Sequence, residues 1–505
     1  MTSRFFQSWL TPILHKWLPV WRFRAQVNGI VRPVVTLLFL TLLLPLLSAC
    51  NTFGGSPSLS GFGPNAGASV GKREHPRVVA AYGGIYRDKK VEALLDDVTS
   101  KLVSSSSAPR QNYRLTVLNS PVVNAFALPG GYLYVTRGLL ALANDTSEVA
   151  AVLSHEMAHV TENHAFQRQQ RARQAKLVNK VVTDVIADEE EGQIALTSSQ
   201  VSLASFSRGQ ELAADRIGVE MMARAGLDPY AAARFLTSMG RYSRFRAASL
   251  SSNANSPNFL ASHPATPARI SQVTETARKF TSRTDRTQEK LRYLDAIDGM
   301  TFGDDPSEGY VRGRSYLHPK LGFSFELPKG YTLENTSEAV LAADKKGTAV
   351  RFDGVQIPSR QPLIDYMASG WVNGLITSTI EGKTIGGLEA ATADARAKGW
   401  RFRIVIIRHK GATYRFIFAN ADKATDLRSD ADKTLSSFRH LGRIETARLK
   451  PLSLKTVQVR PGDTVASMAS QMRGVDRKRS LFLILNAVQD GAGLRPGSLV
   501  KIVVD

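Results

Sequence analysis

The 505-residue chain contains a single cysteine, Cys50. One thiol excludes an internal disulfide, a cysteine-based zinc finger and an iron–sulfur site. Acidic residues are also scarce, because 44 Asp and Glu face 65 Lys and Arg, which gives a net charge of +21. Such a charge predicts an anionic partner, such as nucleic acid, a membrane surface or a cell-wall polymer. With 43% hydrophobic and 22% charged residues, wholesale disorder and fibrous classes are excluded, and the length predicts roughly three domains.

Residues 1–49 have the pattern of a secretory signal peptide. They contain five basic residues and no acidic residue, and an apolar run of 14 residues spans Val34–Leu47. That run is shorter than the roughly 20 residues that cross a bilayer as a helix. A basic stretch, a short apolar run and then the small residues Ser48 and Ala49 are typical of a cleaved signal.

The segment L-S-A-C that ends at Cys50 resembles the bacterial lipobox. The resemblance implies that Cys50 is acylated and becomes the mature N-terminus, followed by a flexible tether over residues 50–75. The alternative is a signal anchor with a chance cysteine. Asn51, in place of an aspartate, favours the outer membrane, so we expect a lipid-anchored protein on the periplasmic face of a bacterial envelope. Loss of residues 1–49 leaves a charge of +16, for which lipid head groups and cell wall, and no nucleic acid, are the expected partners.

Changes in composition predict three folded units in the mature chain. Apolar residues at helical spacing predict a helix over residues 87–104. Strand-like segments on both sides of Pro129-Gly130-Gly131 predict a hairpin. An α+β domain of unknown role is predicted further on, with a distant resemblance to PsbP-like and Mog1-like sheet domains. The predicted boundaries are a first, mainly α domain with a small β-sheet at 76–285, a linker at 286–311, the α+β domain at 312–442 and a small unit at 456–505.

The last unit is predicted to order as strand, helix, helix and strand. Its opening Val457–Thr464, Asn486 after an apolar helix, and Pro496-Gly497 before the final strand resemble a LysM domain. LysM domains bind glycans that contain N-acetylglucosamine, such as peptidoglycan. The basic stretch Arg477–Arg479 departs from that pattern, and glycan binding and a purely structural cap both stay open.

His155, Glu156 and His159 form an H-E-x-x-H motif. Residues four apart lie one turn apart on the same face of a helix, so both imidazoles can reach one metal ion. Glu156 is displaced around the helix and can take a proton from activated water. Asp145 and Glu148 predict a helix start with a capping box just before the motif. The alternative is a surface helix whose histidines are merely polar.

A catalytic zinc needs a third protein ligand. His164 is one candidate, but a metzincin would have its histidine at the next position, which is Ala165. The acidic run 188–191 is a second, and a solvated charge cluster explains it better. Glu211 is the third, because it lies in the first turn of a helix that an S-x-x-Q capping box begins. Glu211 completes a His, His, Glu site, and Asp215, one turn later, can orient a ligand imidazole.

Four segments in this order closely resemble metallopeptidase family M48, the gluzincins that include HtpX-like and CAAX-prenyl-protease-like enzymes. They span about residues 76–282, and the soluble, envelope-located branch is the most similar. The membrane-embedded members have extra spanning helices, which have no counterpart after residue 50. The four segments are Asn124–Gly131, His155–His159, Ser207–Asp215 and His263–Ile270.

The resemblance implies one zinc ion per chain, held by His155, His159 and Glu211. Zinc would polarise the scissile carbonyl and activate water, and Glu156 would pass the proton from water to the leaving amine. Three roles stay open for His263, which are oxyanion stabilisation, a fourth zinc position that holds the enzyme latent, and bracing of its own loop.

The same resemblance implies that Asn124, Ala125 and Phe126 bind substrate by pairing with an extended peptide as an added β-strand. A plain core hairpin is the alternative. Residues 166–200 separate the two ligand helices and are either a lid over the cleft or a solvated helical excursion.

These observations predict a multidomain chain, with a mainly α zincin-like peptidase domain carrying a small β-sheet, an α+β domain and a βααβ LysM-like domain. The predicted function is a zinc-dependent metalloendopeptidase that hydrolyses envelope proteins in quality control. The alternatives are a periplasmic chaperone or peptidoglycan-tethered binding lipoprotein with little proteolysis, and a peptidase of cell-wall stem peptides. Glu156 favours an enzyme, because a binding protein needs no general base beside a metal.

Overall fold

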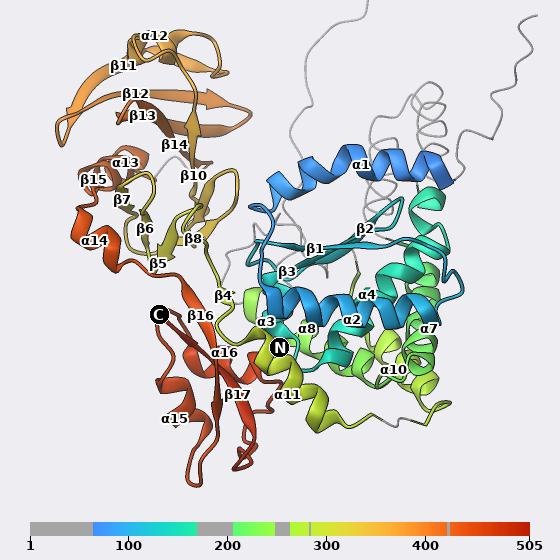
Figure 1. Ribbon diagram of the computed structural model, residues 1–505. Coiled ribbons are helices and arrows are strands. Elements are labelled where there is room, and N and C mark those ends of the chain that lie inside the picture. Colours follow the sequence, from blue (N-terminus) through green and yellow to red (C-terminus); the bar gives the residue numbers. More distant parts are fainter. Residues whose placement is uncertain (1–63, 169–205, 248–262, 282–283, 422–424) are drawn as a thin grey trace, which may run out of the picture. The chain divides into compact units, whose positions relative to one another are not determined.

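A computed structural model describes residues 64–168, 206–247, 263–281, 284–421 and 425–505 (Figure 1). The predicted signal peptide, Cys50, the acidic run 188–191 and most of the predicted lid lie outside the described residues. Among the described helices, none combines the length and the apolar content that a bilayer crossing requires.

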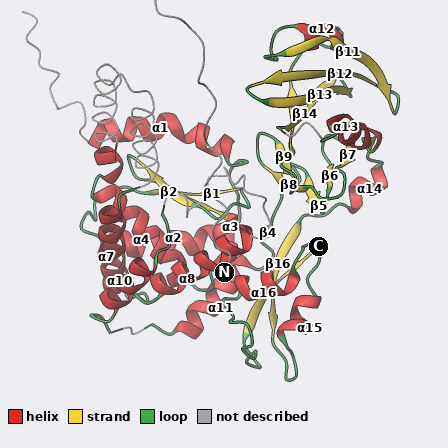
Figure 2. Cartoon of the chain, turned by 180° about the vertical axis from the view of Figure 1, so that it is seen from behind, coloured by secondary structure: helices red, strands yellow, loops and turns green. Residues whose placement is uncertain are grey.

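The first region is mainly helical and carries a small sheet (Figure 2). Strands β1 (Arg114–Leu118), β2 (Ala125–Leu128) and β3 (Tyr132–Thr136) pair in the order β1-β3-β2. β2 and β3 are antiparallel, which confirms the predicted hairpin, and β2 is an edge strand of this sheet. The helices are α1 (Pro64–Ala81), α2 (Lys89–Ser105), α3 (Arg137–Leu142), α4 (Thr146–Thr161), α7 (Arg208–Arg224), α8 (Ala231–Ala247), α10 (Pro267–Ala277) and α11 (Arg286–Ile297).

Helix α1 lies across one face of this sheet (Figure 1). Val78 and Val79 of α1, and Tyr82 directly after it, pack against a buried cluster that includes Tyr134 of β3. The approach is close at Gly71, where a Cβ would lie 2.3 Å from a carbonyl oxygen of the β2–β3 turn, so only glycine fits. Residues 64–75, which we expected to belong to a flexible tether, are therefore helical. Gly and Ser content suggested a tether, but contact with the sheet stabilises a helix there.

The sheet-rich regions follow residue 300 (Figure 2). A seven-stranded sheet has the order β11-β12-β13-β14-β10-β9-β8, and a four-stranded sheet has the order β15-β7-β6-β5. Aromatic side chains of both sheets, among them Phe323 and Phe416, share one buried cluster. The elements are β5 (Tyr310–Arg312), β6 (Ser315–His318), β7 (Phe323–Glu326), β8 (Thr332–Asn335), β9 (Val340–Ala343), β10 (Ala349–Val355), α12 (Leu363–Ala368), β11 (Leu375–Ile385), β12 (Leu388–Ala397), β13 (Trp400–His409), β14 (Ala412–Asn420), α13 (Leu427–Ser436), β15 (Arg439–His440) and α14 (Arg443–Arg448).

The C-terminal module, residues 452–505, runs as strand, helix, helix and strand. Its elements are β16 (Leu452–Gln458), α15 (Val465–Ser470), α16 (Lys478–Leu485) and β17 (Leu499–Val504). β16 pairs with β17 and also with β4 (Thr301–Phe302), all antiparallel. The likeness of this module to LysM domains stays a prediction.

The segment predicted as a linker, residues 286–311, is not an open connection. It contains α11, whose Tyr293, Leu294 and Ile297 are fully buried, and β4, which joins the sheet of the C-terminal module. The buried side chains of α11, of α2 and α4, and of the C-terminal module belong to one hydrophobic cluster. Most side chains of α11 are charged or polar, which is typical of a linker. A narrow apolar stripe is nevertheless enough to bury one face of a helix.

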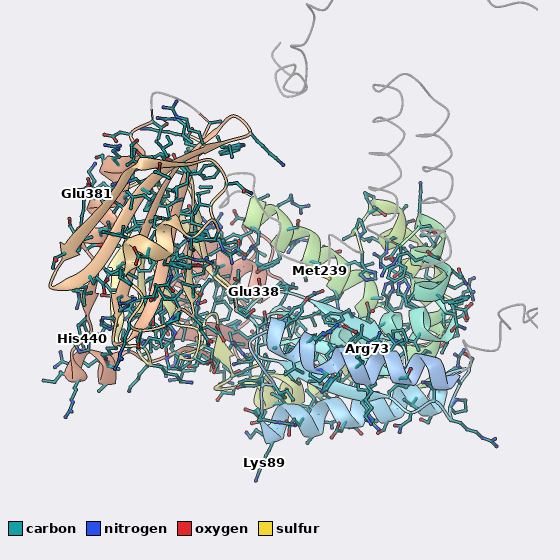
Figure 3. All side chains as sticks on the ribbon, turned by 90° about the horizontal axis from the view of Figure 1, so that it is seen from above. Arg73, Lys89, Met239, Glu338, Glu381 and His440 are labelled. Atoms are coloured by element: carbon teal, nitrogen blue, oxygen red, sulfur yellow. The ribbon has the colours of Figure 1, made fainter. Side chains whose placement is uncertain are left out.

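Most of the positive charge lies on the surface, as the side chain of Lys89 at the start of α2 illustrates (Figure 3). Long basic side chains are rarely fully buried unless they are paired. The described residues nevertheless include four buried cations, Arg137, Arg269, Arg403 and Lys501.

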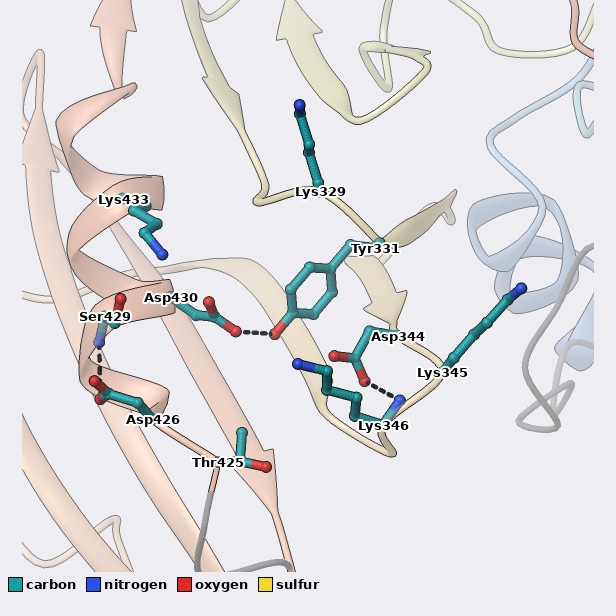
Figure 4. Close-up of a pocket in the computed structure, with 11 residues that line it drawn as sticks. Lys329, Tyr331, Asp344, Lys345, Lys346, Thr425, Asp426, Ser429, Asp430 and Lys433 are labelled. Atoms are coloured by element: carbon teal, nitrogen blue, oxygen red, sulfur yellow. Dashed lines mark hydrogen bonds between the residues drawn. The ribbon is translucent and has the colours of Figure 1, made fainter.

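A cavity of about 680 Å³ lies in the sheet-rich region, beside α13 (Figure 4). Its aspartates accept hydrogen bonds within that region, Asp430 from the Tyr331 hydroxyl at 2.7 Å and Asp344 from the Lys346 backbone nitrogen at 2.9 Å. Neither histidine nor cysteine lines it, so it offers no site for the predicted zinc.

Candidate metal centre

Helix α4 presents the H-E-x-x-H residues inside the fold. It begins after Asp145, whose carboxylate accepts a hydrogen bond from the Glu148 backbone nitrogen at 2.8 Å. Glu148 in turn accepts one from the Asn144 backbone nitrogen at 2.9 Å, a variant of the predicted capping box shifted by one residue. Both bonds satisfy donors that a helix start leaves open. His155 and His159 follow on this helix and are both 4% exposed.

Helix α7 brings the predicted carboxylate to these histidines. Its Ser207–Gln210 capping box is present as predicted, and Glu211 in the first turn is 3% exposed. The two helices approach closely at Gly218, where a Cβ would lie 3.1 Å from the Ser154 hydroxyl and 3.2 Å from the His155 backbone nitrogen. A small residue at this crossing therefore sets the distance between the ligand helices.

Four side chains form a cluster that can bind one metal ion: His155, His159, Glu211 and His263. One potential ligand atom from each lies within 4.8 Å of the others. The Nε2 atoms of His155 and His159 are 3.0 Å apart, and Glu211 oxygens lie 3.6 Å and 3.4 Å from them. His263 enters from the segment before α10, with Nδ1 3.2 Å from His155 Nε2 and 2.9 Å from Glu211 Oε1.

A second set of residues contacts the candidate metal ligands on the side that faces away from the centre of the cluster. Asp215 Oδ1 lies 3.0 Å from His155 Nδ1, where the sequence places an orienting carboxylate. His164 Nδ1 lies 2.9 Å from His159 Nδ1. Arg269 donates to both Asp215 oxygens at 2.7 Å and lies 2.8 Å from Glu211 Oε2. Such outer contacts orient imidazoles and raise their basicity as ligands.

The sequence motifs do not indicate the orienting contacts of His164 and Arg269. His164 is a candidate metal ligand in the sequence, although a histidine five residues after His159 can also contact it on the following turn. Arg269 lay in a matched segment, but its partners come from a different helix, so no local spacing indicates them. Phe206, whose ring stacks on His159 at 4.1 Å, carried no sequence signal at all.

The general-base candidate Glu156 is 2% exposed. Burial raises its pKa to about 8, with Glu211 adding to the rise, while His155, Arg269 and a backbone hydrogen bond from Ala127 oppose it. A carboxyl group with a pKa near neutrality is suited to exchange protons in catalysis. A divalent cation in the cluster would favour its charged form.

The ligand candidates have the protonation states that a metal requires. Burial lowers the pKa of His159 to about 3, so its imidazole is neutral. Burial opposes ionisation of Glu211, but hydrogen bonds from His159 and His263 outweigh it and lower the pKa below its usual range. Neutral imidazole and ionised carboxylate are the forms that bind metal.

The predicted substrate strand lies beside the cluster. β2 contributes the Ala127 backbone hydrogen bond to Glu156. Asn124 is buried and donates through its amide to the Tyr82 hydroxyl at 2.8 Å. Ala125 is fully buried, and the Phe126 ring stacks on Tyr134 at 4.9 Å. These three side chains are packed within the domain. The backbone of the edge strand β2 is therefore the part that can pair with a peptide.

The donor set fits zinc. Two or three imidazoles and one carboxylate that converge within 4.8 Å favour this ion over Mg²⁺ and Ca²⁺, which prefer oxygen ligands. The buried Glu156 Oε1 has no hydrogen-bond partner among the described residues, and such an atom is costly unless water or an ion satisfies it. His155, His159 and Glu211 would hold the ion, with His263 as a further donor.

Asp215→Asn should weaken metal binding without unfolding the chain. Asn keeps the volume but loses the charge that orients His155 and pairs with Arg269, so zinc affinity should fall about 10–100-fold. Competition with a chromophoric chelator measures this. Glu220→Gln, on the same helix but paired only with Arg216 at the surface, is the matched control. Equal affinity for wild type and Asp215→Asn would remove Asp215 from the site.

Comparisons with known proteins agree with this geometry. The model of peptidase family M48 matches residues 89–277. The chain is 28% identical over 295 residues to the beta-barrel assembly-enhancing protease of Yersinia pestis and 26% identical over 205 residues to that of Escherichia coli K12. It is 32% identical over 162 residues to the mitochondrial metalloendopeptidase OMA1 of Bos taurus.

These matches are partial on both sides. The three alignments cover 54%, 39% and 30% of this chain, and 59%, 41% and 30% of the respective relatives. Among solved structures, a cyanobacterial PsbP from Synechocystis aligns with 27% of this chain and 98% of its own, at 17% identity and a TM-score of 0.22, a score too low to carry an argument.

The matched segment contains α4, α7 and all four residues of the metal cluster. M48 peptidases are zinc-dependent, and the cluster has the donors that one zinc ion needs. Residues 89–277 form a peptidase domain of family M48.

Proposed function

We propose that this protein is a zinc-dependent metalloendopeptidase. The observation that carries the proposal is the convergence of His155 Nε2, His159 Nε2 and Glu211 on one buried point, with Glu156 beside it. A bound zinc would supply Lewis acidity at a carbonyl oxygen and would make water a nucleophile at neutral pH.

Glu156 has the position and environment of the proton carrier. Its Oε1 lies 3.7 Å from His263 Nε2 and has no other partner among the described residues. It takes a proton from the attacking water and returns it to the leaving amine. Arg269 and Asp215 hold their ligands in place and take no part in the proton transfer.

His263 competes with substrate for the same space. Its Nδ1 lies among the ligand atoms, 2.9 Å from Glu211 Oε1, so we propose that His263 would serve as a fourth donor to a bound ion and would hold the enzyme latent. This favours the latency role over oxyanion stabilisation and over simple bracing of the loop.

An extended peptide would pair with the free edge of β2. Backbone groups on the outer side of β2 would hold it parallel or antiparallel to that strand regardless of its sequence. Ala125 lies on that side, because the backbone nitrogen and oxygen of Asn124 are both bonded to Thr136 of β3. Such binding suits a protease of unfolded or misassembled chains, because unfolded segments have free backbone groups. Envelope proteins are therefore the proposed substrates.

We further propose that lipidated Cys50 anchors the protein to the outer membrane on its periplasmic side. The basic charge of the chain suits anionic lipid and cell wall. The order of strand, helix, helix and strand in residues 452–505 supports the LysM-like interpretation. An affinity for peptidoglycan follows from it, and a pull-down with purified sacculi tests it.

Removal of the metal tests the peptidase proposal. The full chain in mild detergent should contain one zinc per chain by elemental analysis and should cleave casein. Dialysis against a chelator should abolish cleavage, and one equivalent of zinc should restore it, because no other group in the cluster activates water. A protein that binds zinc without cleaving should gain activity as His263→Ala if latency is the reason. A wild-type chain that binds no metal would contradict the proposal and favour a binding protein.

A further inference from the structure

Lys501 is a buried lysine with a complete set of partners. It lies on β17, near the C-terminus, and is 1% exposed. Its ammonium donates to the carbonyl oxygens of Ala141 at 2.8 Å, Ala143 at 2.6 Å and Leu142 at 3.5 Å. An ammonium group has three N–H donors, and the last carbonyls of a helix have no partner within it. The cation thus caps the negative end of α3.

The turn that Lys501 contacts leads directly into the catalytic helix. Only Asn144 and Asp145 separate Ala143 from the first residue of α4. Asp145 accepts from the Glu148 backbone and Glu148 accepts from the Asn144 backbone at that start. Arg234 of α8 lies 2.9 Å from Asp145 and 3.6 Å from Glu148.

Lys501 also acts on this start through charge. Burial raises the pKa of Glu148, as does Asp145, while Arg234 and Lys501 oppose the rise. Asp145, Glu148 and Asp228 lie around Arg234, which bonds to Asp228 at 2.7 Å, and the more exposed Arg286 lies 3.6 Å from Asp228. Burial lowers the pKa of Lys501, and Glu148 and Asp145 oppose that fall, so the lysine and these carboxylates stabilise each other's charged forms.

The C-terminal module is joined to the helical region in other ways as well. Its apolar residues share the cluster that contains Val149 and Leu153 of α4. Arg477 donates to the Phe245 carbonyl at 2.9 Å and lies 3.6 Å above that ring. A tethered attachment domain would need none of these contacts.

We propose that Lys501 is a positioning residue for the catalytic helix, and that the C-terminal module is a working part of the peptidase. The inference rests on the proposed function. A rise of 1.5 Å per residue puts His155 about 15 Å from Asp145 along α4. A helix transmits a displacement of its first turn to that point, and a shift of about 1 Å at a reacting group can cost about 100-fold in rate.

The test compares Lys501→Met with Lys455→Met in the full chain. Met keeps most of the volume of Lys501 but removes the ammonium donor to the carbonyls of Ala141 and Ala143, while the Leu142 carbonyl keeps the Asn144 amide at 3.0 Å. Lys455, in contrast, is exposed on the neighbouring strand. Lys501→Met should lower kcat for a peptide substrate about 10- to 100-fold and leave KM within about twofold, because β2 is not touched. Amide hydrogens of residues 144–149 should exchange about tenfold faster or more. Lys455→Met should match wild type in all three.

Lys501→Gln separates positioning from packing. Gln retains amide donors for the carbonyls but fills less space than Met, so it should recover part of the lost kcat. Better activity of Met than of Gln, or wild-type kcat and exchange in Lys501→Met, would overturn the proposal. If Lys501→Met does not fold, Lys501→Gln carries the same comparison with wild type. Hydrogen exchange needs no turnover, so a wild-type chain that binds no zinc would refute the proposed function while exchange still decides the role of Lys501.

Discussion

Glu156→Gln should abolish peptide cleavage while the protein keeps its zinc. Gln has nearly the same shape and still accepts a hydrogen bond from the Ala127 backbone, but it cannot take a proton from water. Loss of a general base costs about 10²–10⁴-fold in rate, and Glu156 is proposed to act twice, as base and then as acid. The expected kcat is therefore at the lower limit of a peptide-cleavage assay, with metal content unchanged.

The control for this substitution is Glu162→Gln. Glu162 caps the same helix at its C-terminal end and is exposed, so the same change of charge there should leave cleavage and zinc content at wild-type levels. Glu156→Gln should not be less stable than wild type, because burial disfavours the charged carboxylate that it removes. Cleavage by Glu156→Gln at more than about a tenth of the wild-type rate would exclude Glu156 as the general base.

Glu211→Ala should lose both metal and activity. Zinc sites bind with about 10–16 kcal/mol, and four ligands sharing that energy contribute about 3 kcal/mol each, or roughly 100-fold in affinity. The substitution also removes partners of Arg269 and His263, both buried. Zinc titration should show the loss, and cleavage should recover in part only at high zinc.

Glu220→Ala controls for the loss of a glutamate from the same helix. Its side chain is partly exposed and pairs with Arg216 at 3.0 Å, an interaction that contributes little at a surface. Glu211→Gln serves where Glu211→Ala does not fold, because it keeps the volume and one acceptor oxygen. Zinc binding at wild-type affinity in both Glu211 variants would mean that the third ligand is another residue.

The elements that carry the metal cluster could be predicted because their signals are local. The H-E-x-x-H spacing, the Asp145 start and the Ser207 capping box each lie within one turn of helix, and the structure has helices at these places. The hairpin of β2 and β3 was equally predictable from its Pro-Gly-Gly turn.

Contacts between distant segments could not be predicted. Arg269 meets Asp215 across 54 residues, and Lys501 meets Ala141 across 360. Neither a lysine near a chain end nor an arginine in a helix shows by its type that it is buried. The predictions of a tether and a linker differ from the structure for a related reason. Pro64–Ala81 and Arg286–Ile297 are helices that pack against segments distant in sequence, and the local sequence does not indicate such packing.

The pairing of β4 with β16 has a consequence for the order in which the chain folds. Thr301 and Ser453 are partners, and the hydrophobic cluster around α4 includes Val503. Contacts so far apart in sequence form late, after both segments are available. A chain that emerges N-terminus first cannot complete the surroundings of α4 until residues 452–505 have appeared. A peptidase built in this way would gain activity only after its C-terminal module has been made, and copies that stop before residue 452 would lack it.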